Sequence, residues 1–564
     1  MSQLSEQELV RRDKLTKLRE MGINPYPADV YPVKDTSKSI KSNFKAGHKV
    51  IIAGRLMSRR IQGNASFAEL QDAEGRIQLY FNRDEICSGD DKTKYNTIYK
   101  RLLDIGDFIG IEGELFTTKV GEKTVMVKDF TILSKALKPL PLPKLDAEGN
   151  LHDKFDDPEL RYRQRYADLV VNPHVKTIFV KRTKLFNAMR QFFNDAGYFE
   201  VETPVLQPIA GGAAARPFVT HHNALDIPLY LRIANELYLK RLIVGGFDGV
   251  YEFSKNFRNE GMDRTHNPEF TAMEIYVAYK DYNWMMGFCE RLLEHCALAV
   301  NGTTKVTFGK HDIDFKAPYT RVTMADSIKA FTGFDIIGKS EAEIRQAAKD
   351  MGIEVDDTMG KGKLIDEIFG EKCESHYIQP TFITDYPKEM SPLCKEHRTN
   401  SELTERFELM ICGKEVANAY SELNDPIDQR QRFEHQMELA QKGDDEATAT
   451  IDYDFLRALE YGMPPTSGMG IGMDRLIMFL TNNQSIQEVL FFPQMKPERK
   501  QVDLSEDEKA VFKLLKSSSP IELGTLKGLS GLSNKKWDKT IKGLTGKKVA
   551  KVVKKDEGLF VEVL

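Results

Sequence analysis

One stretch near the middle of the chain, residues 257–270, combines side chains that suit a nucleotide. Arg258 and Glu260 stand two residues apart, so a strand would point both side chains toward one face. A guanidinium binds phosphate, a carboxylate accepts from an amine, and an aromatic ring stacks on a base. These residue types predict an antiparallel nucleotide-binding hairpin, with a charged surface hairpin as the alternative. Its returning part carries His266, Asn267 and Phe270.

A second group of acidic residues lies between positions 406 and 422. A hairpin that turns near Gly413 would bring Glu408 and Glu415 together across two strands. Paired carboxylates close to nucleotide phosphates are a common way of holding magnesium. Charged rungs of a surface hairpin are the alternative. Three further polar residues alternate and would share a face: Asn418, Tyr420 and Glu422.

A third element is a glycine-spaced run, residues 468–480, which predicts a strand that leads into an apolar helix near Asp474. Met473 stands where the dinucleotide fingerprint needs its third glycine, so the run is not that motif. Bare glycines, Gly472 among them, let a ligand lie against the backbone. Arg475 would add a positive charge at the start of the helix, where the helix dipole also favours an anion.

The elements that must position these residues differ along the chain. Residues 4–21 form an amphipathic pattern, and 48–136 read as short alternating strands with one helical crossing at 95–103. The strands predict a small five-stranded barrel of the OB type, which often binds single-stranded nucleic acid. Phe67 and Gln78 would then supply a stacking ring and a base-edge amide. A barrel used only for packing is the alternative.

The proline-rich run 139–143 predicts a stiff linker before a large mixed α/β domain, from about 160 to 497. That domain opens with a helix at 174–196 and has a helical segment at about 322–370. Within this segment, residues 333–340 match the phosphate-loop pattern. Because a helix precedes them, and because Ser340 with Glu343 forms a capping box, we do not interpret them as a nucleotide site.

The composition changes after about residue 500. Ten lysines fall between positions 527 and 555, against one acidic residue, Asp538. The pattern predicts two short helices and a terminal strand at 558–563, which together resemble a small winged helix. A nucleic-acid contact and a solvated lysine-rich appendage both remain open for this segment.

The whole chain of 564 residues has a net charge of −4 and 41% hydrophobic residues, as an ordinary multidomain globular protein has. Its six cysteines include no Cys-x-x-Cys pair, which argues against a structural zinc site and against a disulfide framework. No signal peptide and no apolar run of about 18 residues is present, so we expect a cytoplasmic protein without a membrane span.

Together, three motifs carry a resemblance to a known family. The helix that leads to Pro204, the hairpin around Arg258 and the strand and helix from Gly470 to Arg475 resemble motifs 1, 2 and 3 of the class II aminoacyl-tRNA synthetases. Within that class, the runs at 161–166, 211–218, 236–241 and 266–271 are similar to the bacterial-type lysyl-tRNA synthetases.

The resemblance implies a mixed α/β multidomain fold. It has an N-terminal OB-type five-stranded barrel, a class II catalytic domain built on an antiparallel sheet flanked by helices, and a small C-terminal winged-helix-like appendage. The expected domains are 1–47, an N-terminal helix and lead-in; 48–138, the anticodon-binding barrel; 139–160, a linker; 161–498, the catalytic domain with its insertion at about 322–370; and 499–564, the lysine-rich extension.

The resemblance also implies an activity, the ligation of L-lysine to tRNA(Lys) with ATP through a lysyl-adenylate, by a homodimer built on the motif 1 helix. The implied catalytic residues are Arg258 and Arg475, and the implied Mg²⁺ ligands are Glu408 and Glu415. The lysine site would comprise Gly212, Glu236, Arg258, Glu274, Tyr276, Asn418, Tyr420 and Glu422. The ATP site would comprise Arg258, Glu260, His266, Asn267, Phe270, Glu415, Gly472 and Arg475. The anticodon would meet Phe67, Gln78 and Asp129.

Three other functions fit these residues less well. An aspartyl- or asparaginyl-tRNA synthetase of the same architecture would need a cation for the substrate side chain, which these pocket positions lack. A ligase that transfers lysine to a translation-factor protein would lack the barrel predicted at 48–136. A catalytically silent nucleic-acid-binding relative would not need Arg258, Glu408, Glu415 and Arg475 together.

Overall fold

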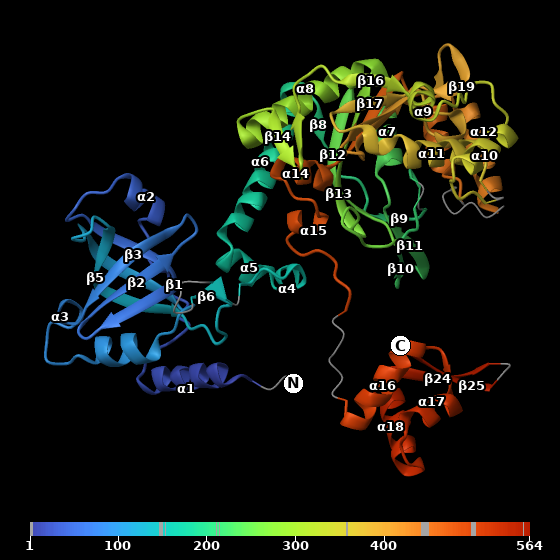
Figure 1. Ribbon diagram of the computed structural model, residues 1–564. Coiled ribbons are helices and arrows are strands. Elements are labelled where there is room, and N and C mark those ends of the chain that lie inside the picture. Colours follow the sequence, from blue (N-terminus) through green and yellow to red (C-terminus); the bar gives the residue numbers. More distant parts are fainter. Residues whose placement is uncertain are drawn as a thin grey trace. The chain divides into compact units, whose positions relative to one another are not determined.

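The computed structural model describes residues 4–145, 151–152, 154–209, 211–213, 215–356, 359–441, 450–497, 504–555 and 558–563. Parts of the predicted linker, residues 146–150 and 153, lie outside these ranges, as do Ala214 and the predicted boundary at 498 and 499. The chain forms two compact units, Met1–Gln494 and Met495–Leu564, which are described separately (Figure 1). Within the described ranges, no helix combines the length and the apolar character that a membrane crossing requires.

The first unit begins with the predicted N-terminal helix, a second short helix that the sequence did not predict, and the predicted closed barrel. Its strands pair in the order β1-β2-β3-β5-β4, and alternate residues of β2 and β3 are buried, because strand side chains point to opposite faces. The crossing between β3 and β4 is helical, with the wide π-helical spacing at η1. The elements are α1 (Glu6–Glu20), α2 (Ser37–Ser42), β1 (Lys49–Gln62), β2 (Ala65–Gln71), β3 (Arg76–Asn82), α3 (Arg83–Ile86), η1 (Lys94–Leu102), β4 (Phe108–Thr117) and β5 (Lys123–Ser134).

Short elements connect the barrel to the long helix α6 (Pro173–Asp195), which matches the helix predicted at 174–196. Proline at its first position suits a helix start, since that N–H has no partner in the helix. Gly197 follows the helix with a positive φ of 80°, which glycine adopts without strain. The connecting elements are β6 (Lys144–Leu145), β7 (Leu151–His152), α4 (Pro158–Arg163) and α5 (Arg165–Val171).

An eight-stranded sheet forms the centre of the larger domain, in the order β16-β17-β20-β21-β22-β13-β12-β8. All neighbours are antiparallel except β16 with β17 and β12 with β8. The sheet is therefore mostly antiparallel, as the resemblance to the class II synthetases implied. Its strands are β8 (Phe199–Glu200), β12 (Gly249–Phe257), β13 (Glu269–Ala278), β16 (Thr320–Thr323), β17 (Thr381–Thr384), β20 (Arg406–Ile411), β21 (Lys414–Ser421) and β22 (Thr466–Gly472).

One face of this sheet is apolar and carries the main core. Met273 and Ile275 of β13 pack there with side chains of α6, α8 (Tyr282–Asn301) and α14 (Met473–Thr481), which lie together in Figure 1. Residues that alternate with these, such as Glu274, point to the opposite face. The opposite face is thereby left for polar side chains.

Further helices and hairpins surround the polar face. The segment that matches a phosphate loop is not one: a helix, α9, precedes it, and Ser340 caps α10 in a capping box with Glu343, as the sequence predicted. The remaining elements of this unit are β9 (Leu206–Gln207), β10 (Val219–His222), β11 (Ile227–Leu231), α7 (Glu236–Val244), β14 (Lys305–Phe308), β15 (His311–Asp314), α9 (Met324–Thr332), α10 (Glu341–Asp350), α11 (Lys361–Lys372), η2 (Glu374–His376), η3 (Lys388–Met390), β18 (Glu396–His397), β19 (Asn400–Thr404), α12 (Pro426–Gln441), α13 (Tyr453–Glu460) and α15 (Ile486–Val489).

The second unit has its own small core, in which Val511, Leu526, Trp537 and Leu544 are buried. Its sheet has the order β23-β25-β24. The two predicted helices and the terminal strand are present, and the structure adds a preceding helix and two strands that the sequence reading did not include. The elements are α16 (Glu506–Ser518), β23 (Ile521–Glu522), α17 (Leu523–Ser530), α18 (Asn534–Gly546), β24 (Ala550–Lys555) and β25 (Gly558–Val563).

Candidate active site

Two rows of residues cross the polar face of the eight-stranded sheet. In the first row, Glu274 pairs with Gly470. Gly470 pairs with Asn418, and Asn418 with Glu408. Directly opposed residues of antiparallel strands share a face, so strand register alone gathers these side chains, which lie far apart in the sequence.

The second row contains Gly468, a position at which no residue with a side chain would fit. Gly468 pairs with Tyr276 on one side and with Tyr420 on the other. A Cβ atom at Gly468 would lie 2.4 Å from Cε1 of Tyr276 and 2.2 Å from Oε1 of Glu422. The bare backbone is therefore what lets both side chains reach this position.

Gly470 and Gly472 have a different role from Gly468. A Cβ at either position would meet its first neighbour only at 3.7 Å, so these two glycines leave an open floor beneath the cavity. The alternating glycines predicted from the sequence thus let a ligand approach the sheet closely at two positions and admit protein side chains at the third.

A cavity of about 1020 Å³ lies over this floor. Every residue that the resemblance assigned to lysine, ATP or magnesium lines it, except Glu422, which is buried with its carboxylate against Gly468. The lining residues of the lysine set are Gly212, Glu236, Arg258, Glu274, Tyr276, Asn418 and Tyr420. Those of the ATP and metal sets are Glu260, His266, Asn267, Phe270, Glu408, Glu415, Gly472 and Arg475, together with Arg258.

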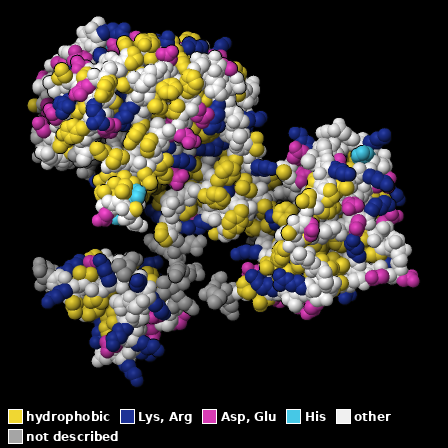
Figure 2. Space-filling view, turned by 180° about the vertical axis from the view of Figure 1, so that it is seen from behind, with side chains coloured by type: hydrophobic (Ala, Val, Ile, Leu, Met, Phe, Trp, Pro, Cys, Tyr) yellow, Lys and Arg dark blue, Asp and Glu magenta, His cyan; other side chains and the backbone are white. Residues whose placement is uncertain are grey.

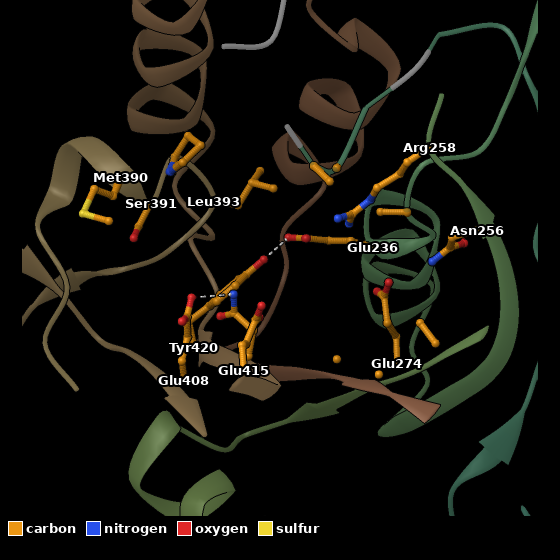
Figure 3. Close-up of a pocket in the computed structure, with 18 of the residues that line it drawn as sticks. Glu236, Asn256, Arg258, Glu274, Met390, Ser391, Leu393, Glu408, Glu415 and Tyr420 are labelled. Carbon is orange, nitrogen blue, oxygen red and sulfur yellow. Dashed lines mark hydrogen bonds between the residues drawn. The ribbon is translucent and has the colours of Figure 1, made fainter. Parts of the chain in front are cut away.

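A buried lysine joins two of the carboxylates. Lys240 Nζ lies 2.6 Å from Oε1 of Glu236 and also pairs with Glu422, and the side chains of Lys240 and Glu422 are fully buried. The hydroxyl of Tyr420 donates to Glu236 Oε1 over 2.5 Å (Figure 3). The sequence reading missed Lys240. Its spacing of four residues from Glu236 on one helix was the available signal, although that spacing is more typical of exposed pairs.

The pKa values in this cluster reflect burial and crowding of like charges. Burial, with Glu236 adding to it, raises the pKa of Glu274 to about 8. Burial also raises the pKa of Glu422 well above its ordinary value, and the nearby Lys240 opposes that rise only in part. For Lys240 itself, burial lowers the pKa, but Glu236 and Glu422 outweigh it and raise the pKa overall. The cluster is thus short of positive charge.

Arg258 also lines the cavity, with its guanidinium directed inward near Glu236 in this view (Figure 3). Its Nε atom is buried and has no hydrogen-bond partner among the described residues. The guanidinium stacks over the ring of Phe270, 5.1 Å from the ring centre, and burial lowers the pKa of Arg258. Its backbone N–H donates to the carbonyl of Pro268 over 2.8 Å, which fixes the predicted hairpin. An anion in the cavity would satisfy the unpaired guanidinium nitrogen.

A second basic pair stands at the end of the hairpin. Nη2 of Arg475 lies 3.1 Å from Nε2 of His266, and Nη1 donates to the backbone carbonyl of Glu415 over 2.8 Å. Nδ1 of His266 lies 2.8 Å from Oδ2 of Asp263, a residue that the sequence reading did not single out. The contact with Asp263 orients the imidazole, so that its other nitrogen faces Arg475.

The predicted acidic hairpin is present, with its turn at Cys412 and Gly413. A bulge after Leu409 places Glu415 opposite Met410. Burial, followed by the charge of Glu415, raises the pKa of Glu408 to about 7.

Carboxylates held this close together, with one of them retaining a proton near neutral pH, suit a divalent cation. Among the described residues no group of three or more His, Cys, Asp or Glu side chains could hold a metal ion. A magnesium ion here would therefore need oxygen ligands from a bound phosphate as well as from Glu408 and Glu415.

The barrel carries a separate aromatic surface on its outer face. The ring of Phe67 lies 5.0 Å from that of Tyr80, which lies 5.8 Å from that of Phe116. Gln78 is two residues from Tyr80 on β3 and shares its face, whereas Asp129 forms an exposed ion pair with Lys94. The sequence reading missed Tyr80 and Phe116, although the alternation within β3 already placed Tyr80 beside Gln78.

Comparison with known proteins agrees with this geometry. Residues 157–496 match the family described as tRNA synthetases class II (D, K and N), and residues 50–133 match the OB-fold nucleic acid binding domain. The chain therefore belongs to the class II tRNA synthetases.

The individual relatives narrow the family further. A protein named lysine–tRNA ligase from Christiangramia forsetii is 77% identical over 563 residues, which cover 100% of this chain and 99% of that protein. Another of that name from Porphyromonas gingivalis (strain ATCC BAA-308 / W83) is 70% identical over 88% of this chain and 86% of its own length. A third, from Azobacteroides pseudotrichonymphae, is 63% identical over 88% of this chain and 99% of its own length. Within the class, these relatives place the chain in the lysine–tRNA ligase family.

Proposed function

We propose that this chain ligates L-lysine to tRNA(Lys) with ATP, through a lysyl-adenylate, and releases AMP and pyrophosphate. The observation that carries the proposal is the charge balance of the cavity. Glu236 and Glu422 share the buried ammonium of Lys240, and Glu274 is buried near Glu236, so this cluster, when ionised, has three negative charges against one positive charge. Lysine brings two ammonium groups.

The same balance argues against an acidic substrate. The side-chain carboxylate of aspartate would meet like charges in this cluster, and juxtaposed like charges cost several kcal/mol, about enough to exclude a competitor. Asparagine would leave the buried carboxylates without a cation. The α-carboxylate of lysine has a partner in the cavity wall, Arg258, whose Nε atom is buried and unpaired among the described residues.

In the first proposed step, a carboxylate oxygen of lysine attacks the α-phosphorus of ATP, the bond to the bridging oxygen breaks, and pyrophosphate leaves. The nucleophile is already ionised, so orientation and charge neutralisation suffice. Arg258 holds the lysine carboxylate and the α-phosphate together. His266 contacts the outer phosphates, and Arg475 lies on the face of the adenine ring opposite Phe270. The base is held by Glu260 at its amine and by Phe270 on its ring, with Gly472 and Asn267 beside the nucleotide.

Magnesium held by Glu408 and Glu415 would neutralise phosphate charge. In the second step, the terminal hydroxyl of the tRNA attacks the lysyl carbonyl and AMP leaves. The barrel would bind the anticodon through Phe67, Gln78 and Asp129. Its aromatic outer face supports this assignment, because aromatic rings stack on unpaired bases.

The proposal extends to assembly and organisation. A cytoplasmic homodimer built on α6 fits the exposed apolar residues Val180 on α6 and Phe199 on the edge strand β8. The proposed domains are 1–47, 48–138, 139–160, 161–498 and 499–564.

Amino-acid-dependent ATP–pyrophosphate exchange tests the function directly. We expect L-lysine to stimulate exchange with the purified chain, and aspartate and asparagine to give only the background rate. Exchange driven by another amino acid and not by lysine would remove the specificity argument. Subsequent charging of tRNA(Lys), compared with tRNA(Asp), tests the second step.

A further inference from the structure

The C-terminal unit is not used by the function proposed above. Residues 504–564 contain thirteen lysines and eight acidic residues, a formal charge of +5 in a chain whose net charge is −4. The match to the synthetase family ends at residue 496, the second residue of this unit, so nearly all of the unit lies outside the match. The positive charge is thus concentrated in a unit outside the catalytic domain. Lysine side chains are visible over the surface of this unit (Figure 2).

The unit contains two helices in a helix-turn-helix arrangement. Three residues, 531–533, join α17 to α18, and Gly531 takes a positive φ of 63° in this turn. Trp537, Thr540 and Leu544 of α18 are buried, at spacings of three and four residues, so they anchor one side of α18 in the core. In such an arrangement the second helix has its other side free to meet a nucleic acid.

The free side of α18 carries three exposed lysines. Lys535, Lys539 and Lys542 are spaced four and three residues apart, which places them in one stripe, called here the α18 lysine stripe. None of the three forms an ion pair within the described residues. Lysines elsewhere in the unit do, since Lys551 and Lys555 both pair with Glu562, at 3.1 and 2.9 Å. The charge of the stripe is therefore available to a ligand.

We propose that the α18 lysine stripe binds the phosphate backbone of the tRNA that the enzyme charges, which rests on the function proposed above. The ammonium groups are carried about 6 and about 4.5 Å apart along the helix axis. A nucleic acid strand offers one phosphate per roughly 3.4 Å of its axis, so consecutive lysines reach separate phosphates. A lipid surface fits less well, because the large apolar residues Trp537 and Leu544 of α18 are buried in the core of the unit.

The test compares two charge-matched triple variants of the full-length chain. One replaces the stripe (Lys535→Gln, Lys539→Gln, Lys542→Gln). The other replaces three lysines of α16 (Lys509→Gln, Lys513→Gln, Lys516→Gln). The dissociation constant for tRNA(Lys) is measured over a series of salt concentrations, and lysine-dependent exchange is measured without tRNA.

We expect the stripe variant to lower the slope of log affinity against log salt by about 2 to 3, since each lost phosphate contact removes about 0.7 to 0.9. The α16 variant should keep the wild-type slope, and exchange should be unchanged in both. Restoring charge with Lys535→Arg, Lys539→Arg and Lys542→Arg should restore the slope.

Four results would overturn the inference. These are an unchanged slope in the stripe variant, an equal loss of slope in both variants, competition by polyglutamate as strong as by tRNA, and a loss of affinity in the stripe variant that is larger for duplex DNA than for tRNA. Failure of lysine to stimulate exchange would instead overturn the proposed function. The two proposals can therefore fail separately.

Discussion

Lysine side chains occupy two opposite environments in this chain, the cavity and the C-terminal unit. Lys240 is fully buried between two carboxylates, whereas the lysines of the α18 stripe are exposed and have no acidic partner among the described residues. A buried charge pair leaves a costly unpaired group when one member is removed, while an exposed charge is well solvated alone. Lysine thus neutralises buried carboxylates in the cavity and supplies positive charge to the surface of the C-terminal unit.

The largest expected effect is on the buried side of this comparison. Replacing Lys240 by methionine leaves Glu236 and Glu422 without their shared cation, which should destabilise the first unit by about 3–5 kcal/mol. Thermal unfolding followed by calorimetry measures the loss. Lys539→Met is the matched control and should change stability by less than about 0.5 kcal/mol. Equal losses of stability in the two variants would show that the buried Lys240 contributes no more to stability than an exposed lysine.

The next effect concerns Arg258, the partly unpaired cation in the cavity wall. Arg258→Ala removes a buried donor aimed at the reacting groups and should reduce lysine-dependent exchange by about 10²–10³. Arg457→Ala, at an exposed ion pair with Asp454, should leave exchange unchanged. Circular dichroism checks that both variants fold. Retention of most of the exchange activity in Arg258→Ala would exclude this residue from the centre of the reaction.

A third prediction follows from the raised pKa of Glu274, about 8. Glu274 holds a proton near pH 7, and a cationic substrate favours its ionised form, so lysine binding should release protons and tighten as pH rises toward 8. The pKa of Glu274 is higher in the folded protein than in the unfolded chain. The contribution of the neutral carboxyl to the stability of the fold is therefore fully present at low pH and is lost as pH rises through about 8.

Calorimetric titration of lysine in two buffers of different ionisation enthalpy measures that release. Glu274→Gln should release fewer protons per lysine bound. The free energy of unfolding of Glu274→Gln should also rise relative to that of the wild type as pH rises from about 4.5 to 8. Identical proton release in the two proteins would show that Glu274 is already ionised.

The smallest effect belongs to an exposed pair on the barrel. Asp129→Asn breaks an ion pair with Lys94 that is about half exposed, so stability should change by less than about 1 kcal/mol. Affinity for a tRNA(Lys) anticodon stem-loop, measured by fluorescence anisotropy, should change more than stability does. Phe67→Leu, which removes a stacking ring, is the comparison and should weaken binding by about 1–3 kcal/mol.

Much of the fold followed from local pattern. Alternation predicted the barrel strands, and the capping box of Ser340 correctly excluded a phosphate loop, because both features depend on neighbours a few residues away. Sequence spacing also predicted the hairpins around Arg258 and Gly413. The residues assigned to lysine, ATP and magnesium came from a family resemblance, and the structure brings all but Glu422 to the wall of one cavity.

The sequence reading missed groups whose role depends on long-range contacts. Lys240 matters because Glu422 lies beside it, 182 positions further along the chain, and helix periodicity cannot report that contact. Tyr80 and Phe116 form one surface only after β4 and β5 close the barrel. Asp263 depends on how the loop before His266 folds back. Burial and register, which decide all three, are properties of the assembled sheets.

The alternating glycines of β22 make the register of this strand ambiguous during folding. Sliding this strand by two residues would exchange one glycine for another on the cavity face and Met469 for Ile471 on the core face, so its own side chains barely distinguish the two alignments. Contacts at the two ends of β22 must therefore determine which alignment forms. Ser467 Oγ donates to the Tyr420 carbonyl over 3.0 Å, and Asp474 accepts from the Thr271 N–H over 2.7 Å. Without these two hydrogen bonds, β22 could pair with its neighbours in a register shifted by two residues. The glycines would still line the cavity, but Arg475 would be displaced by two residues.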